Sequence, residues 1–201
     1  MNSPAKPIRG IAILGMNGAG KSTLAHALAK ATGFAELDVE DFYFPEQRAS
    51  RLHALDHDTV AETAHLGDLP FSVARTKPEV EQLLLEAMSN ESGFILAGVT
   101  LNFCPAILSR IDLAVVLSTP LEMRLQRIEN RELRRFGTRV LPGGDMYDQQ
   151  VEFRETARSR DPETAARSAA QIGCPVLHMD GTAPAAQNTA LLLTHIFPEN
   201  K

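Results

Sequence analysis

The stretch Gly15-Met16-Asn17-Gly18-Ala19-Gly20-Lys21-Ser22, followed by Thr23, reads G-x-x-x-x-G-K-S and decides the fold. The short apolar run at 11–14 before it is typical of a buried parallel strand. Residues 23–30 after it are rich in strong helix formers and predict a helix. A strand, a glycine-rich turn and a helix in this order are the context in which the motif holds phosphate groups. A glycine-rich turn that binds nothing is disfavoured, because the lysine and the serine are both present.

Each residue type in this stretch has a chemical reason. The glycines let successive backbone N–H groups converge on phosphate oxygens without a Cβ in the way. The start of the helix near Ser22 adds the positive end of its dipole. Lys21 is expected to reach the β- and γ-phosphates, and the Ser22 hydroxyl to take one position on Mg²⁺. We therefore expect ATP and Mg²⁺ as cofactors, with the nucleotide held by Gly15, Asn17, Gly18, Ala19, Gly20, Lys21, Ser22 and Thr23.

Length, charge and cysteine content narrow the class of protein. The 201 residues predict a single α/β domain over 1–201. The formal net charge of −5 disfavours a nucleic-acid or membrane-surface binder, so we expect ATP and a small molecule as partners of a monomer or homodimer. Cys104 and Cys174, far apart in the chain, fit a reduced cytoplasmic protein. No signal-peptide pattern and no run of transmembrane length is present.

Carboxylates follow the second strand candidate, residues 34–37. Asp38, Glu40 and Asp41 come directly after it. Ligands of open α/β sheets bind outside the carboxyl ends of the strands, which favours a functional cluster over a solvated acidic turn. The aromatic run Phe42-Tyr43-Phe44 also argues against a purely solvated loop, because such rings require burial or a ligand.

The residues around Asp41 also carry a resemblance to a known family. Lys21 followed by Asp41-Phe42-Tyr43-Phe44-Pro45 resembles the uridine kinase and nicotinamide riboside kinase group of phosphate-loop kinases. The resemblance implies that Asp41 is the base that takes the proton of the acceptor hydroxyl. Asp38 and Asp41 are also similar to the D-x-D of shikimate- and gluconate-type kinases, which implies Asp38 beside Ser22 at the metal. The spacing differs from D-x-D by one residue, so the roles of Asp38 and Asp41 stay open. A description as an AAA-type ATPase is compatible with the same resemblance.

The segment that follows has no strong hydrophobic period over 46–77 and is long for a plain connection. We expect an acceptor-binding insertion at about 42–78. Arg48 and Arg51 within it are candidates for contact with an anionic substrate, although exposed arginines are common.

A basic helix is the second informative element. Residues 111–117 predict a buried strand, Thr119 suits a helix cap, and Pro120 suits the first helical turn. Five arginines of the following helix fall within roughly one third of its circumference: Arg124, Arg127, Arg131, Arg134 and Arg135. Like charges four residues apart repel, so segregated arginines without interleaved carboxylates favour a phosphate partner. A solvated basic face is the alternative.

This helix resembles the lid helix of the adenylate-kinase-like superfamily, whose R-x-x-x-R arginines reach the transferring phosphate. The resemblance implies Arg127 and Arg131 as catalytic residues, in a lid over about 124–160. The turn Pro142-Gly143-Gly144 can act as its hinge, although an ordinary loop between helices fits equally well. In this superfamily the turn at Asp180-Gly181-Thr182 lies against the nucleotide base.

The remaining pattern completes the predicted fold. Strands are expected at 94–99 and 175–179, and helices at 79–89, at 149–170 with a break near Asp161-Pro162, and at 185–196. The alternation predicts a three-layer α/β/α fold with a five-stranded parallel sheet, of the P-loop nucleoside and nucleotide kinase type. The function we expect is transfer of the ATP γ-phosphoryl group to a hydroxyl of a small molecule such as a nucleoside or polyol. A nucleoside monophosphate kinase and a nucleotide-binding switch or ATPase without an acceptor are the alternatives.

Overall fold

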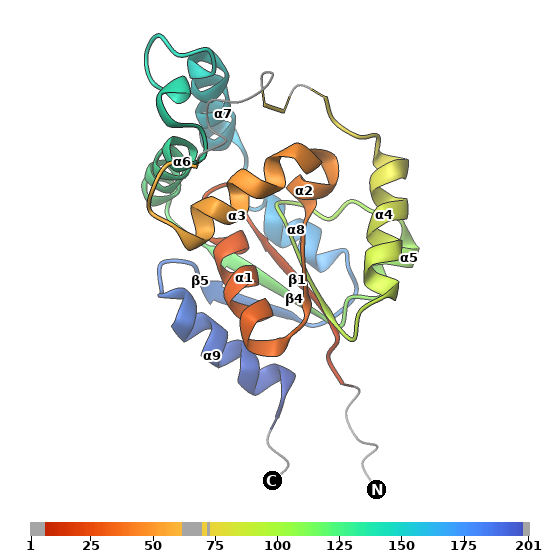
Figure 1. The fold of residues 1–201 in the computed structure, drawn as a ribbon. Helices are drawn as coiled ribbons and strands as arrows, with labels where there is room; N and C mark the ends of the chain where they lie inside the picture. Colours follow the sequence, from red (N-terminus) through yellow and green to blue (C-terminus); the bar gives the residue numbers. More distant parts are fainter. Residues whose placement is uncertain (1–6, 62–69, 72, 199–201) are drawn as a thin grey trace, which may run out of the picture.

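A sheet of five parallel strands forms the centre of the molecule, in a computed structural model that describes residues 7–61, 70–71 and 73–198 (Figure 1). The strand order is β2-β3-β1-β4-β5. The strands are β1 (Gly10–Gly15), β2 (Ala35–Asp38), β3 (Phe94–Gly98), β4 (Leu113–Ser118) and β5 (Val176–Asp180). The expected five-stranded parallel sheet is confirmed.

The central strand β1 explains the unbroken apolar runs in the sequence. All six of its residues are buried, and Ile11 pairs with Ile95 of β3 on one side and with Leu113 of β4 on the other. A parallel sheet that is covered on both faces leaves no polar face, so its strands read as continuous hydrophobic segments. The carboxyl end of β1 therefore opens directly into the glycine-rich stretch.

Helices cover both faces of the sheet. The helices α1 (Lys21–Thr32) and α9 (Ala185–Ile196) lie on the same side in Figure 1, and their apolar residues share one core cluster with Ile11 and Ile13. The opposite face packs against α4 (Lys77–Ser89), α5 (Pro105–Leu108) and α8 (Thr164–Ala170), around Ala12 and Leu14. The two clusters confirm the three-layer architecture.

The other helices lie near the carboxyl ends of the strands. After β2 come α2 (Val39–Tyr43), the 3₁₀ turn η1 (Pro45–Gln47) and α3 (Arg48–Asp56). After β4 come α6 (Leu121–Phe136), the 3₁₀ turn η3 (Gly137–Val140) and α7 (Tyr147–Ser159), which project from the sheet in Figure 1. These last three elements occupy most of the segment predicted as a lid.

Several local predictions can be compared with these elements. The predicted helix at 185–196 is confirmed at both ends, and the break near Asp161-Pro162 is confirmed because α7 ends at Ser159 and α8 begins at Thr164. The prediction of Thr119 as a helix cap was wrong. Pro120 occupies that position, and the Thr119 hydroxyl donates instead to the Ala19 carbonyl at 3.1 Å.

The expected insertion at 42–78 is described only in part. Residues 62–69 and 72 lie outside the described residues. The helix α3 within the insertion, and α2, which overlaps only its first two residues, were not predicted. Among the residues that the structure describes, no helix is long and apolar enough to span a membrane.

Candidate active site

The glycine-rich stretch, residues 15–22 and called the P-loop here, turns tightly from β1 into α1. The Ala19 N–H donates to the Met16 carbonyl at 3.0 Å, and Gly18 and Gly20 have φ of 79° and 101°. These left-handed angles favour glycine. A Cβ on Gly18 would also lie 2.3 Å from the backbone oxygen of Arg124, so α6 can pack against the loop only because residue 18 has no side chain.

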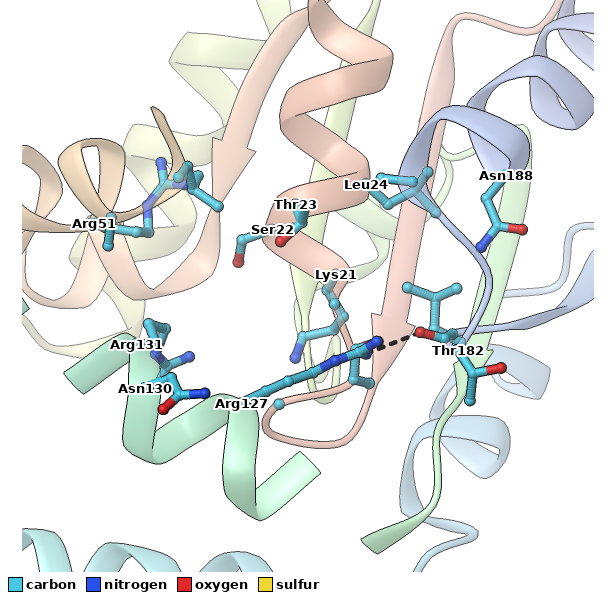
Figure 2. Close-up of a pocket in the computed structure, with 18 of the residues that line it drawn as sticks. Lys21, Ser22, Thr23, Leu24, Arg51, Arg127, Asn130, Arg131, Thr182 and Asn188 are labelled. Atoms are coloured by element: carbon cyan, nitrogen blue, oxygen red, sulfur yellow. Dashed lines mark hydrogen bonds between the residues drawn. The ribbon is translucent and has the colours of Figure 1, made fainter. Parts of the chain in front are cut away.

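The P-loop borders a cavity of about 520 Å³ (Figure 2). Its floor includes Lys21, Ser22 and Thr23 at the start of α1. Four arginines of α6 line it: Arg127, Arg131, Arg134 and Arg135. In Figure 2, Arg51 and Arg131 lie at one end and Thr182 and Asn188 at the other, with Lys21 and Arg127 between them. The cavity thus joins three regions that are far apart in sequence.

Lys21 points into the middle of this cavity (Figure 2). Its ammonium group donates to the Met16 carbonyl at 3.2 Å, and none of its described contacts is an ion pair with a carboxylate. Burial lowers the pKa of Lys21 to about 8; Asp38 opposes this shift and Arg131 adds to it. A desolvated lysine of this kind gains most when an anion such as a phosphate arrives.

This lowered pKa predicts how nucleotide affinity changes with pH. The protonated form of Lys21 attracts the triphosphate, and its population falls as the pH rises through about 8. We therefore expect the affinity for ATP, measured in EDTA by calorimetry, to be constant below that value and to weaken above it by up to about tenfold per pH unit. The Lys21→Arg variant should show no such loss between pH 7 and 10. A wild-type affinity that stays flat over this range would contradict the assignment.

Ser22 and Asp38 present the oxygen donors that a magnesium ion would use. The Ser22 hydroxyl donates to Asp38 Oδ2 at 2.6 Å, while Asp38 Oδ1 accepts from the Glu40 N–H at 3.0 Å and caps α2. Burial raises the pKa of Asp38, and Arg51 opposes this shift. Within the described ranges no group of three or more His, Cys, Asp or Glu residues could hold a metal ion. One carboxylate and one hydroxyl nevertheless fit Mg²⁺, which completes its coordination with phosphates and water.

Arg51 organises the carboxylates that follow β2. Its Nε and Nη2 donate to the two oxygens of Asp41 at 2.9 and 2.6 Å, and its Nη1 donates to Glu36 at 2.8 Å. The same Nη1 lies 3.9 Å from Asp38. Arg51 is 5% exposed, and these bonds raise the pKa of its guanidinium despite burial. Arg51 lines the cavity, but its guanidinium is held by these carboxylates, so its contact with an anionic substrate stays a prediction.

Removal of this guanidinium should destabilise the folded protein. In Arg51→Met, three largely buried carboxylates would lose the guanidinium that they share, and we expect a loss of about 3–5 kcal/mol in the free energy of unfolding. The matched variant Arg48→Met should cost less than about 1 kcal/mol, since Arg48 is 63% exposed and lies 3.8 Å from Asp41. Urea denaturation measures both. Equal losses in the two variants would show that Arg51 is not the organising cation.

Asp41 and Glu40 occupy different positions relative to the cavity. Both oxygens of Asp41 are engaged by Arg51, and Asp41 is not among the residues that line the cavity. Glu40 lines the cavity and lies 2.8 Å from Arg135 Nη1. Burial alone would raise the pKa of Glu40, but the guanidinium groups of Arg135 and Arg131 more than offset this and lower it. The ionised carboxylate that faces the cavity is therefore Glu40.

The arginines of α6 have individual partners. Arg131 pairs with Glu132 through Nε at 2.6 Å, and Arg134 pairs with Asp58 at 2.8 Å. The expectation of arginines without interleaved carboxylates was wrong for these two and for Arg135, because Glu132 is buried between α6 side chains and other carboxylates come from distant segments. Arg127 has no carboxylate partner among the described residues.

Arg127 spans the P-loop and the turn after β5. Its Nη1 donates to the Gly181 carbonyl at 2.9 Å, drawn as the dashed line in Figure 2, and to the Ala19 carbonyl at 3.4 Å. Gly181 and Thr182 line the same end of the cavity. The turn that the resemblance placed against a nucleotide base is thus part of the cavity wall. Arg160 reaches the other side of the P-loop and donates to Asn17 Oδ1 at 3.1 Å.

Comparison with known proteins is consistent with this geometry. A family model described as an AAA domain matches residues 11–139, which include the P-loop, the carboxylates after β2 and all of α6. The chain belongs to this AAA domain family. A curated relative, the uncharacterized protein YqaC of Bacillus subtilis (strain 168), is 30% identical over 180 residues, covering 86% of this chain and 88% of the relative.

Two solved kinase structures are similar to the chain over nearly its whole length. A shikimate kinase from Acinetobacter baumannii in complex with shikimate matches with a TM-score of 0.48 and 19% identity, over 96% of this chain and 95% of that chain. A gluconokinase from Sinorhizobium meliloti 1021 matches with a TM-score of 0.45 and 15% identity, over 98% and 100%. The P-loop and the order of the parallel strands give the chain a three-layer α/β/α P-loop fold.

Sequence reasoning missed Glu40 in this AAA domain. The signal was nevertheless present, because Asp38-Val39-Glu40 keeps the two-residue spacing of D-x-D with glutamate as the second acid. Sequence reasoning also missed that Arg51 pairs with carboxylates of its own chain. No local pattern indicates it, since its partners Glu36 and Asp41 meet it only when α3 folds back on the end of β2.

Proposed function

We propose that this protein transfers the γ-phosphoryl group of ATP to a hydroxyl of a small molecule. The observation that carries the proposal is the single cavity in which the P-loop, the carboxylate Glu40 and the arginines of α6 face one another. Phosphoryl transfer asks little covalent chemistry of a protein and depends on positioning and on neutralising charge. The described side chains of this cavity supply both functions.

The nucleotide would occupy the half of the cavity between the P-loop and the turn after β5. The P-loop amides and the dipole of α1 would hold the phosphates, and Lys21 would neutralise the β- and γ-phosphates. Arg127, which lies between Ala19 and Gly181, would bind next to the base and the α-phosphate. Arg131 stays charged because Glu132 and Glu40 offset its burial and raise its pKa. It would stabilise the charge that develops on the transferred group.

Ser22 and Asp38 would hold Mg²⁺ through the two oxygens that lie 2.6 Å apart. The ion, when bound, would supply positive charge that neutralises the phosphates. Burial of Asp38 favours its protonated form, so binding of a cation would shift the carboxyl group toward the ionised form.

The acceptor would occupy the end of the cavity near Arg51 and Arg131 (Figure 2). Its hydroxyl oxygen attacks the γ-phosphorus while its proton passes to Glu40, and the bond to the β–γ bridging oxygen breaks so that ADP leaves. Arg135 holds Glu40 from one side at 2.8 Å and so fixes its orientation. Asp41 remains the base implied by the family resemblance, but it reaches the acceptor only if Arg51 releases it.

Two observations bear on the class of acceptor. The aromatic side chains of Phe42 and Tyr43 pack against the core, so they give no support to a nucleoside in particular. Arg51 is occupied by carboxylates, so the cationic pocket that a monophosphate acceptor was expected to use is not formed by this residue. We therefore propose a hydroxyl-bearing small molecule and leave its class to experiment.

Steady-state ADP release from Mg·ATP tests this function. Nucleosides, sugar alcohols, hydroxy acids and nucleoside monophosphates are supplied one at a time to the purified full chain. We expect one class to raise turnover at least tenfold above the rate without acceptor. Equal turnover with every class and without any of them would overturn the proposal.

A further inference from the structure

A second cavity lies beside the P-loop, on the face of the sheet that α8 covers. It has a volume of about 230 Å³ and shares only Leu117 with the first cavity among the described lining residues. Met16, the carboxyl end of β4, His178 of β5 and the start of α8 form its walls. Apart from Met16, which belongs to the P-loop, the proposed phosphoryl transfer uses none of these residues. The cavity therefore has no assigned role.

Arg124 gives this cavity its charge. The side chain lines the wall and is only 5% exposed. Its Nη1 donates to the Asn17 carbonyl at 3.3 Å, which is the one hydrogen bond that the side chain makes to a described residue. No carboxylate of the described chain lies within ion-pair distance of it, whereas Arg131, Arg134 and Arg135 on the same helix all have such partners.

Burial of an uncompensated charge is costly, which is why buried charges in proteins are normally paired. The pKa of Arg124 is lowered by burial alone, with no neighbouring charge to offset the loss of water. Arg127 also has no carboxylate partner, but it faces the cavity where the nucleotide phosphates are expected. Because Arg124 lines the second cavity, we expect the anion that neutralises its charge to bind there.

Two further donors of the cavity wall have no partner within the described part of the chain. These are the hydroxyl of Ser118 and the imidazole of His178, which lie on the same face of paired strands because Val116 is opposite His178 in the register. Glu163 is the carboxylate in the wall, and it is exposed at the edge of the cavity. Ser118 and His178 are exposed as well, so the cavity presents one buried donor, the guanidinium of Arg124, and an exposed hydroxyl and ring nitrogen at its mouth.

We propose that this second cavity binds a small oxyanion, a phosphate or carboxylate group, with Arg124 as its counter-charge. A guanidinium binds such groups through two parallel N–H bonds, and the hydroxyl and imidazole can donate to the remaining oxygens. The cavity volume of about 230 Å³ is several times the roughly 30 Å³ that one water molecule occupies in the liquid. A tetrahedral oxyanion therefore fits.

The test must separate this site from the P-loop, which is itself expected to bind phosphate. The imidazole signals of His178 in ¹H–¹⁵N spectra, assigned with His178→Gln, report on the second cavity alone. Inorganic phosphate and malonate are titrated separately into the full chain, with and without a non-hydrolysable ATP analogue. We expect at least one of the two anions to shift the His178 signals in a saturable way under both conditions. Which anion does so identifies the source of the group.

Variants complete the test. Arg124→Gln should weaken the binding of that anion at least tenfold, while Ser118→Ala should weaken it severalfold and leaves the contact to Asn17 in place. Arg160→Gln is the matched control, because Arg160 also contacts Asn17 but does not line the second cavity. It should leave anion binding unchanged. The proposal is overturned if neither anion shifts His178, or if Arg124→Gln and Arg160→Gln bind the anion as the wild type does.

Discussion

Replacing Lys21 by methionine is expected to lower kcat by about 10²–10³-fold, the usual loss when one preorganised donor to the reacting group is removed. The ammonium group of Lys21 lies in the middle of the cavity and has no ion-pair partner in the described chain, so its charge is available to the phosphates. Methionine keeps the length and the apolar stem of the side chain. Removal of a desolvated cation also relieves a burial cost, so the free energy of unfolding should not fall.

Lys30→Met is the matched control, on the same helix. Its side chain is 64% exposed and pairs with Asp56 at the surface. We expect kcat within a factor of two of the wild type. Rapid-quench measurement of ADP formation, combined with thermal unfolding of both variants, separates catalysis from stability. Comparable kcat values for Lys21→Met and wild type would mean that the P-loop does not hold the transferred phosphate.

Glu40→Gln is expected to lower kcat by about 10²-fold while the affinity for ATP stays within a few fold. Glutamine keeps the size and the hydrogen-bonding reach of the side chain but cannot take the proton of the acceptor hydroxyl. Glu40 faces the cavity, and Arg135 and Arg131 keep its pKa low, so the wild-type carboxylate is ionised at neutral pH. The residual rate should come from the charges of Lys21 and Arg131.

The variant Asp41→Asn tests whether Asp41, which the family resemblance implies, or Glu40, which lines the cavity, is the base. Since both oxygens of Asp41 bind Arg51, we expect Asp41→Asn to lower stability and to reduce kcat by no more than about tenfold. Single-turnover rates and urea denaturation of both variants give the comparison. A large loss of kcat in Asp41→Asn together with a near-normal rate in Glu40→Gln would restore Asp41 as the base.

The elements that sequence reasoning placed correctly are those with a strong local pattern. The continuous apolar runs of β1, β3 and β4 allow only buried strands, and the P-loop follows β1 at once. The helix α9 has polar and apolar residues at helical spacing between Pro184 and Phe197, so both of its ends could be predicted. Here local propensity and tertiary structure agree, which is what makes a pattern readable.

The elements that were missed depend on contacts between distant segments. In α3 the buried positions are Ser50, Arg51 and Ala54, so a search for an apolar stripe finds none. Arg51 is buried because Glu36 and Asp41 neutralise it, and neither residue lies on its own helix. The partners of the α6 arginines have the same origin, since Glu40 and Asp58 come from the segment after β2. A helical projection shows which residues share a face but not which charges fold against it.

The fate of the γ-phosphoryl group is the most direct test of the account. ATP labelled with ³²P at the γ-position is incubated with the protein and the acceptor that most raises ADP release. We predict that the label appears in a new phosphorylated compound in a one-to-one ratio with ADP, and that Glu40→Gln slows both products equally. Label recovered only as inorganic phosphate, at a rate that no acceptor changes, would contradict transfer to an acceptor and identify the protein as a nucleotide-hydrolysing switch.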